Sequence, residues 1–374
     1  MPANQLQELD LPQGIRTRLV ENHNGLSMHV LEAGYETPGR PALLLLHGFP
    51  ELAYSWRKTM LPLAAAGYHV IAPDQRGYGR TTGWDGNYDG DLASFRTHNM
   101  ARDALGLIMA MGYREVAAVI GHDVGSFVAS YCTLVRPDVF RRMALLSVPF
   151  EGPPALPFAT LGEAPAGSPA PDIHDHLATL PNPRKDSLRY FASREANDDM
   201  LHCEQGLNNF FRAYYHFKSA DWKQNRPHPL ASFTASELAK IPTYYMMNMD
   251  EGMAVTVAPQ MPSPQEIAAC RWLPEAELAY YSQEFERTTF KGAVQWFRCQ
   301  MGSIGRTELE LFSGRTIDVP SCFISGSSDW ATYRKPGGCA PFARGWIIFT
   351  SSMEPVTGSS RSNRTASTNC SWLF

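Results

Sequence analysis

Short apolar runs that alternate with helix-length stretches constrain the fold of this chain more than any other feature. Five such runs, each with Gly, Pro or Asp within two residues of one end, lie at residues 41–46, 69–72, 115–120, 142–148 and 319–324. Stretches long enough for helices separate most of them, for example residues 52–66, 95–111 and 126–136. Buried strands that alternate with helices predict an α/β fold, a mostly parallel sheet flanked by helices and joined by right-handed crossovers.

The alternation stops at Pro149, and the composition changes there. Residues 151–172 contain six Pro and three Gly, which is typical of a linker or excursion, and a strand pattern resumes only at Ile317. In between, the pattern is mostly helical and rich in aromatic residues and Met. We therefore expect a core interrupted by a helical cap, divided into core (1–150), excursion and cap (151–312), core (313–337) and an atypical tail (338–374).

Composition narrows the class of protein. The 374 residues carry 33 Lys+Arg against 37 Asp+Glu, a formal charge of −4 without blocks of one sign, so neither nucleic acid nor an anionic membrane surface is an expected partner. No apolar run approaches the roughly 20 residues of a membrane-spanning helix. The seven Cys are scattered and the N-terminus has no apolar signal region, which predicts a soluble, cytoplasmic protein.

The segment VIGHDVGS, residues 119–126, carries the clearest chemical signal. Small residues two before and two after Asp123 permit a sharp turn from a buried strand into a helix, which is the nucleophile elbow with Asp in place of Ser. A carboxylate nucleophile forms an ester with carbon electrophiles such as epoxides or alkyl halides. The competing interpretation is that Asp123 only caps the following helix.

A second segment supports the elbow. HGFPE, residues 47–51, follows the apolar run that ends at Leu46 and precedes Asp123 by about 75 residues. Gly48 lets the backbone turn, so that the N–H groups of Phe49 and Val124 would together form an oxyanion hole. His47 and His122 are interpreted as structural neighbours of these motifs.

HGFPE, then DQRGYG at residues 74–79, then GHDVG and an inserted segment resemble the epoxide hydrolases of the α/β-hydrolase superfamily. The resemblance covers about residues 12–337. It implies an eight-stranded core, a helical cap over the active site, and two cap tyrosines that donate hydrogen bonds to the epoxide oxygen while the Asp opens the ring.

The resemblance also suggests individual residues. YSQEFERTTFKG, which begins at Tyr281, matches the surroundings of the second cap tyrosine, and FRAYY at residues 211–215 offers Tyr214 or Tyr215 as the first, with Tyr214 favoured. Asp329, after the last apolar run, resembles the acid that orients a catalytic His. Trp56 and Tyr215 are interpreted as substrate-binding residues.

Alternatives remain open at this point. A haloalkane dehalogenase is the second hypothesis, and it is weakened because Val124 stands where those enzymes carry a Trp after the nucleophile. A non-catalytic protein that binds small molecules on the same fold is the third. The predicted substrate is a small apolar epoxide with water, so no cofactor is implied. His174 and His176 lack a supporting ligand set, so no metal is expected either.

The general base that hydrolyses the ester, normally a His after the late acid, is absent. The chain has 11 His, and none follows Asp329. The tail from Gly338 to Phe374 also contains one acidic residue in 37, and 11 of the 37 are Ser or Thr.

A change of reading frame accounts for this tail. Permissible codons for residues 345–374, read two bases later, encode LDHLHLIDGAGHWVQQEQPHR, which resembles the family's strand, His loop and final helix. The His codon would straddle Val356 and Thr357. We hypothesise that the gene or its record shifted frame near Gly337–Gly338, and that the present tail leaves the protein less stable.

Overall fold

A computed structural model describes residues 9–156, 172–302 and 304–334, together with the backbone of 347–351. Most of the predicted excursion, and the tail apart from residues 347–351, therefore lie outside the described residues. So do Val356 and Thr357, where the alternative frame would encode its His.

Within these residues, eight strands form one sheet in the order β1-β2-β4-β3-β5-β6-β9-β10. β1 and β2 pair antiparallel, β2 is also antiparallel to β4, and the neighbours from β4 to β10 are parallel. The strands are β1 (Ile15–Glu21), β2 (Ser27–Ala33), β3 (Ala42–Leu46), β4 (His69–Pro73), β5 (Ala118–His122), β6 (Met143–Leu146), β9 (Ser321–Gly326) and β10 (Ile347–Ser351). The predicted mostly parallel α/β fold is confirmed, and the five predicted runs correspond to β3, β4, β5, β6 and β9.

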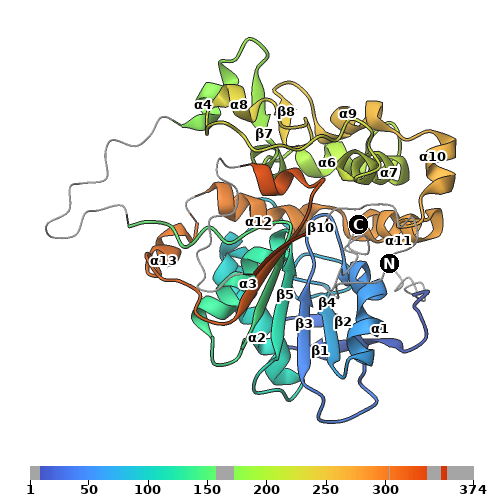
Figure 1. Cartoon of the computed structure of the whole chain (residues 1–374), viewed down its shortest axis with the longest axis vertical. Helices are drawn as coiled ribbons and strands as arrows, with labels where there is room; N and C mark the ends of the chain where they lie inside the picture. Colours follow the sequence, from blue (N-terminus) through green and yellow to red (C-terminus); the bar gives the residue numbers. More distant parts are fainter. Residues whose placement is uncertain (1–8, 157–171, 303, 335–346, 352–374) are drawn as a thin grey trace, which may run out of the picture.

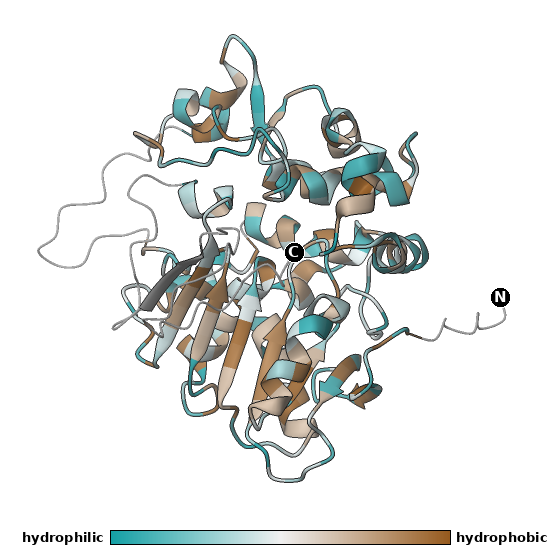
Figure 2. Ribbon diagram, turned by 45° about the vertical axis from the view of Figure 1, so that its right-hand side comes forward, coloured by the Kyte–Doolittle hydropathy of each residue, from teal (hydrophilic) through white to brown (hydrophobic). Residues whose placement is uncertain are grey.

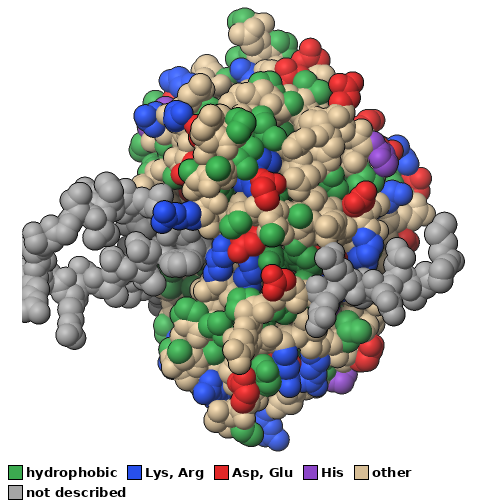
Figure 3. Space-filling view, turned by 90° about the vertical axis from the view of Figure 1, so that its right-hand side faces the viewer, with side chains coloured by type: hydrophobic (Ala, Val, Ile, Leu, Met, Phe, Trp, Pro, Cys, Tyr) green, Lys and Arg blue, Asp and Glu red, His purple; other side chains and the backbone are tan. Residues whose placement is uncertain are grey.

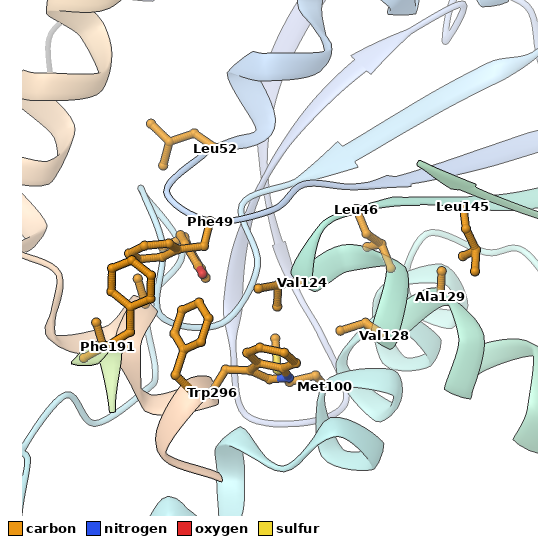
Figure 4. Packing of buried hydrophobic residues seen from close by; sticks show 14 of the residues in the cluster. Leu46, Phe49, Leu52, Met100, Val124, Val128, Ala129, Leu145, Phe191 and Trp296 are labelled. Atoms are coloured by element: carbon orange, nitrogen blue, oxygen red, sulfur yellow. The ribbon is translucent and has the colours of Figure 1, made fainter. Parts of the chain in front are cut away.

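Helices cover both faces of the sheet, and the alternation along β3 shows how. Leu43 and Leu45 belong to one buried cluster with Met60 of α1 (Arg57–Ala65). Leu44 and Leu46 belong to another that includes side chains of α2 (Thr97–Ala110) and α3 (Val124–Val135). Figure 4 shows Leu46 close to α3 in this second cluster. Because both faces are covered, the strand carries an unbroken apolar sequence, and Figure 2 shows the hydrophobic colour concentrated in these strands.

A long segment lies between β6 and β9. In Figure 1 most of it lies above the sheet, with α12 near the strands and the two-stranded β7–β8 sheet farther away. The short antiparallel pair of β7 (Arg184–Asp186) and β8 (Met246–Asn248) is a feature that the helical pattern did not predict. The described helices of the segment between β6 and β9 are α4 (Ile173–Ala178), α5 (Ser187–Phe191), α6 (Ala196–Leu201), α7 (Leu207–Lys218), α8 (Ala235–Leu238), α9 (Met253–Val257), α10 (Pro264–Ala269), α11 (Glu275–Thr288), α12 (Lys291–Met301) and α13 (Arg306–Glu310).

Four short 3-10 helices complete the described elements. They occur in connections of the core and of the inserted segment, at η1 (Ala53–Trp56), η2 (Leu92–Phe95), η3 (Ala258–Gln260) and η4 (Trp330–Tyr333).

β10 differs from the expectation for the tail. Residues 338–374 were assigned to an atypical tail outside the core, yet Ile347–Ser351 pairs in parallel with β9 at the edge of the sheet. Ile, Phe and Thr dominate this run, and such residues favour a pleated, extended backbone. The low content of acidic residues in the tail therefore did not prevent β10 from forming.

The surface carries charges of both signs. Figure 3 shows Lys and Arg interspersed with Asp and Glu on one face of the molecule. Among the described residues, no helix is both long and apolar enough to cross a membrane.

Candidate active site

Asp123 occupies a strained turn between β5 and α3. Its φ is 50° and its ψ is −117°, a backbone conformation that non-glycine residues rarely adopt. A Cβ on Gly125 would lie 2.2 Å from the carbonyl oxygen of Leu46, so only glycine allows the helix to start this close to β3. Within the part of the chain that the structure describes, Asp123 makes no side-chain capping hydrogen bond to α3. This geometry favours the elbow over the capping interpretation.

One carboxylate oxygen of Asp123 is held by the loop after β3. The Phe49 N–H donates to Asp123 Oδ1 at 3.1 Å. A Cβ on Gly48 would lie 2.5 Å from the Asp123 Cβ, which explains a glycine at this position. Val124 begins α3 and therefore has its N–H at the helix N-terminus beside Asp123. Oδ1 of Asp123 is thus held by a backbone N–H of the loop after β3.

A buried acid–base pair supports the same loop. Glu51 Oε2 contacts His122 Nδ1 at 2.9 Å and also accepts from the Gly48 N–H at 3.1 Å. Burial alone would lower the pKa of His122, but the Glu51 carboxylate raises it above its usual value. Burial alone would raise the pKa of Glu51, and His122 lowers it below its usual value. The pair therefore favours the ionised state of both residues, and His122 also lines a cavity with Asp123.

His47 has a structural role, as expected. Its Nε2 accepts from the Gln75 N–H at 3.1 Å, and its Nδ1 lies 2.9 Å from the Gly48 carbonyl oxygen. Burial lowers the pKa of His47, which favours the neutral ring that these contacts require.

Asp329 lies after β9 and reaches the same region. Ser147 Oγ donates to Asp329 Oδ2 at 2.5 Å, and the Ala331 N–H donates to its Oδ1 at 2.8 Å. Burial raises the pKa of Asp329 despite these two donors. Asp329 and Asp123 line one cavity from different strands of the sheet.

Two cavities meet at Asp123. They have volumes of about 580 Å³ and about 370 Å³. Six residues contribute to both, namely Phe49, Asp123, Tyr214, Lys218, Tyr244 and Tyr245. The larger cavity is mostly apolar, with walls that include Val124, Phe127, Leu177, Phe191, Phe233, Met246, Trp296 and Phe297. Figure 4 shows Phe49 facing Phe191 of the inserted segment, with Val124 and Trp296 nearby.

The structure brings only some of the predicted binding residues to these cavities. Tyr214 lines both, and Tyr215 lines the smaller one while its hydroxyl donates to the Pro50 carbonyl oxygen at 2.7 Å. Tyr281 instead shares a 2.9 Å hydrogen bond with Ser55 Oγ. Trp56 packs in the buried cluster on the α1 face of the sheet. Neither Tyr281 nor Trp56 is among the described residues that line the two cavities.

Sequence reasoning missed three residues at the centre of the site. Lys218, Tyr244 and Tyr245 line both cavities with Asp123. A signal for Lys218 existed, because it lies four residues after Tyr214 and so shares its helix face. Tyr244 and Tyr245 precede β8, and their position depends on how the inserted segment packs. Among the described residues there is no group of three or more His, Cys, Asp or Glu that could hold a metal ion.

Comparisons with known proteins agree with this geometry. The model of the α/β-hydrolase fold family matches residues 41–332. Epoxide hydrolase A of Mycobacterium tuberculosis is 32% identical over 332 residues, which cover 84% of this chain and 83% of that protein. Epoxide hydrolase 3 of Siraitia grosvenorii is 30% identical over 317 residues, or 84% and 82% of the two chains.

Solved structures give the same result. An epoxide hydrolase from an endophytic Streptomyces superposes with a TM-score of 0.66 at 26% identity, covering 91% of this chain and 89% of the other. A laboratory-evolved variant of potato epoxide hydrolase gives 0.64 at 26% identity, covering 90% and 92%. The elbow, the helix-flanked parallel sheet and these likenesses lead to one conclusion: the chain belongs to the α/β-hydrolase fold family and, within it, to the group that contains these epoxide hydrolases.

Proposed function

We propose that this chain opens an apolar epoxide to a vicinal diol through an ester on Asp123. The observation that carries the proposal is the Asp123 carboxylate, which lies at a strained elbow, faces a mostly apolar cavity and is bound through one oxygen by the Phe49 N–H. A side chain held in this way attacks rather than caps. The epoxide hydrolases to which the chain is similar support an epoxide as the electrophile.

The first half-reaction needs only groups of the described site. Oδ2 of Asp123 forms a bond to an epoxide carbon, the bond from that carbon to the ring oxygen breaks, and the oxygen leaves as an alkoxide that takes up a proton. Tyr214 is the proton donor that we favour, because this residue lines both cavities together with Asp123. The product is a hydroxyalkyl ester of Asp123.

The second half-reaction would use water at the ester carbonyl carbon. The negative charge that develops on Oδ1 would be stabilised by the Phe49 N–H that already binds this atom, with the N–H of Val124 as the second donor. Asp329 is suited to orient a neutral His that would take a proton from that water, and to stabilise the imidazolium that forms, but the sequence has no His after it. We therefore expect the chain as written to form the ester once and to release diol very slowly.

The proposal is tested by trapping the ester. Styrene oxide, an apolar epoxide, is expected to raise the intact mass of the protein by one epoxide molecule, and peptide mapping should find it on Asp123. Asp123→Asn is the matched control, because it keeps the shape of the side chain and removes the nucleophilic carboxylate. An unchanged mass, or an adduct that forms equally on Asp123→Asn, would refute the proposal.

Two further assays on the same protein distinguish the proposed function from a dehalogenase and from a non-catalytic binding protein. A dehalogenase would release halide from 1-chlorobutane and leave styrene oxide intact. Val124 argues against this activity, since its side chain has no N–H to bind a departing halide. A binding protein is favoured by the missing His, and it would retain styrene oxide reversibly with no covalent mass.

The hypothesis that a frame shift removed the catalytic His is tested by sequencing the gene across codons 325–374. A missing or extra base near Gly337 is expected, and the corrected chain would end in a tail that carries a His. We expect that corrected chain to hydrolyse its ester repeatedly and to unfold at a higher denaturant concentration. An intact reading frame would remove the frame hypothesis and leave a protein that reacts once.

We further propose that the protein works in a reducing compartment such as the cytoplasm. The described cysteines are all free thiols, namely Cys132, Cys203, Cys270, Cys299 and Cys322. Reducing compartments maintain thiols in this state.

A further inference from the structure

Lys218 is a basic side chain at the centre of the candidate site. It is the last residue of α7, and it lines both cavities together with Asp123. A cation beside an attacking carboxylate influences every charge that forms during the reaction, because the enclosed site screens charges poorly.

Three tyrosine rings surround this ammonium group. Its Nζ lies 5.1 Å from the ring centre of Tyr214, 5.2 Å from that of Tyr245 and 5.8 Å from that of Tyr244. Nζ also donates to Tyr214 Oη at 3.4 Å. Aromatic faces attract a cation without neutralising it, so the rings hold the ammonium in place and leave its charge available.

The charge of Lys218 has no close counter-ion among the described residues, since none of their carboxylates lies within ion-pair distance of Nζ. Burial alone would lower the pKa of Lys218, but the nearby Tyr214 and Tyr245 hydroxyls and Asp123 raise it well above its usual value. Lys218 therefore stays protonated near neutral pH. A buried ammonium without a carboxylate partner is suited to stabilise an anion that appears only during the reaction.

The position of Tyr281 means that another residue must provide the second group that stabilises the charge on the ring oxygen. The family resemblance assigns the second donor to Tyr281, yet its hydroxyl is bound to Ser55 Oγ at 2.9 Å and it is not among the described residues that line the two cavities. Tyr214 does line them, and its hydroxyl is bound to Lys218.

We propose that Lys218 is the positioning cation for ring opening, acting through Tyr214. As Oδ2 of Asp123 bonds to the epoxide carbon and the ring C–O bond breaks, the alkoxide takes the proton of the Tyr214 hydroxyl, and Lys218 stabilises the resulting tyrosinate until water reprotonates it. This inference rests on the proposed function. It goes further in replacing the pair of tyrosines by a tyrosine backed by a lysine.

The test compares two electrophiles that differ in their need for a proton. Styrene oxide leaves an alkoxide on carbon, whereas benzyl bromide releases bromide, which needs no proton. The rate of Asp123 ester formation is measured by intact mass for the wild-type chain and for Lys218→Met. We expect Lys218→Met to slow the reaction with styrene oxide about 10²-fold, the loss typical of one electrostatic donor, and to leave the reaction with benzyl bromide nearly unchanged.

Two further variants sharpen the test. Lys218→Arg keeps the charge and should recover part of the rate with styrene oxide. Lys185→Met is the matched control, because Lys185 also lies over a tyrosine ring, 5.6 Å from the centre of Tyr190, but lines a separate cavity with no contribution from Asp123. It should react with styrene oxide at the wild-type rate.

The outcomes are distinguishable. If the wild-type chain forms no ester with styrene oxide, the proposed function fails and this inference fails with it. If the wild type reacts and Lys218→Met reacts with styrene oxide equally fast, the inference alone is overturned. It is also overturned if Lys218→Met slows both electrophiles to the same extent, because that result identifies a structural role.

Discussion

The hydrogen bond between Tyr281 and Ser55 determines what the Tyr281 hydroxyl can contribute. The two oxygens lie 2.9 Å apart, and burial raises the pKa of Tyr281 to about 12. A hydroxyl that is already paired, on a side chain outside the cavity lining, is poorly placed to activate an epoxide. The sequence alone could not reveal this, because the surroundings of Tyr281 match the family pattern and the competing partner lies 226 residues away.

Two substitutions distinguish the tyrosines. Tyr281→Phe should lower stability by about 1 kcal/mol through the lost hydrogen bond and leave the rate of Asp123 ester formation close to that of wild type. Tyr214→Phe should slow ester formation with styrene oxide about 10²-fold, since it removes the proton donor. Single-turnover mass spectrometry and urea unfolding measure the two effects. A large loss of rate in Tyr281→Phe would return the donor role to Tyr281.

The Glu51–His122 pair predicts a pH-dependent stability. The pKa of His122 is raised above 6.5, so its contribution is fully present below pH 6.5 and is lost as the pH rises through the raised value. The pKa of Glu51 is lowered below 4.5, so its contribution is present above pH 4.5 and is lost as the pH falls through the lowered value. The pair therefore stabilises most between pH 4.5 and 6.5.

Glu51→Gln tests this window. We expect it to lower the free energy of unfolding by about 3 kcal/mol inside the window, because it leaves one buried charge unpaired, and by less as the pH rises above it. Glu308→Gln is the control, since Glu308 pairs with Arg96 and His98 at a partly exposed site and should cost below about 1 kcal/mol. Urea unfolding at a series of pH values provides the measurement, and a loss independent of pH would contradict the assignment.

Among the elements, the connection from β5 to α3 leaves no space for a side chain at Gly125. Gly125→Ala would place a Cβ 2.2 Å from the Leu46 carbonyl oxygen, so α3 would have to move away from β3. We expect a loss of about 3 kcal/mol together with slower ester formation, because Asp123 moves with the helix. Gly326→Ala is the control, since its Cβ would meet its nearest neighbour at an ordinary 3.8 Å. Thermal unfolding that is the same for both variants would contradict the prediction.

A strand could be predicted from the sequence where its own residues define it, but not where its pairing partner does. β3 is recognisable because both of its faces are buried, which gives the uninterrupted run ALLLL. The prediction for β5 began at residue 115, but the strand is Ala118–His122, since its register follows from pairing with β3, where Leu46 opposes Gly121. β7 and β8 have three residues each, too few for an alternating pattern, and they are defined by each other.

At the scale of the whole molecule, the turn that carries Asp123 was predictable from the sequence, and the residues around it only in part. Asp123 and Phe49 lie in local motifs, where a few neighbouring residues determine the turn. Lys218, Tyr244 and Tyr245 reach the site from the inserted segment, so their positions depend on how that segment packs over the sheet. A sequence pattern records periodicity along the chain, but it does not record which inserted helix lies over which strand.

The two cavities that Asp123 lines have a consequence for handedness. Their volumes of about 580 Å³ and about 370 Å³ are unequal, and Asp123 is one of the residues that they share. A substituted epoxide would place its bulkier substituent in the larger cavity. In this orientation one enantiomer exposes its epoxide carbon to Oδ2 of Asp123, and the other enantiomer does not. The molecule should therefore sort a racemate, consuming one enantiomer of styrene oxide first, and chiral chromatography of the unreacted epoxide would show which one remains.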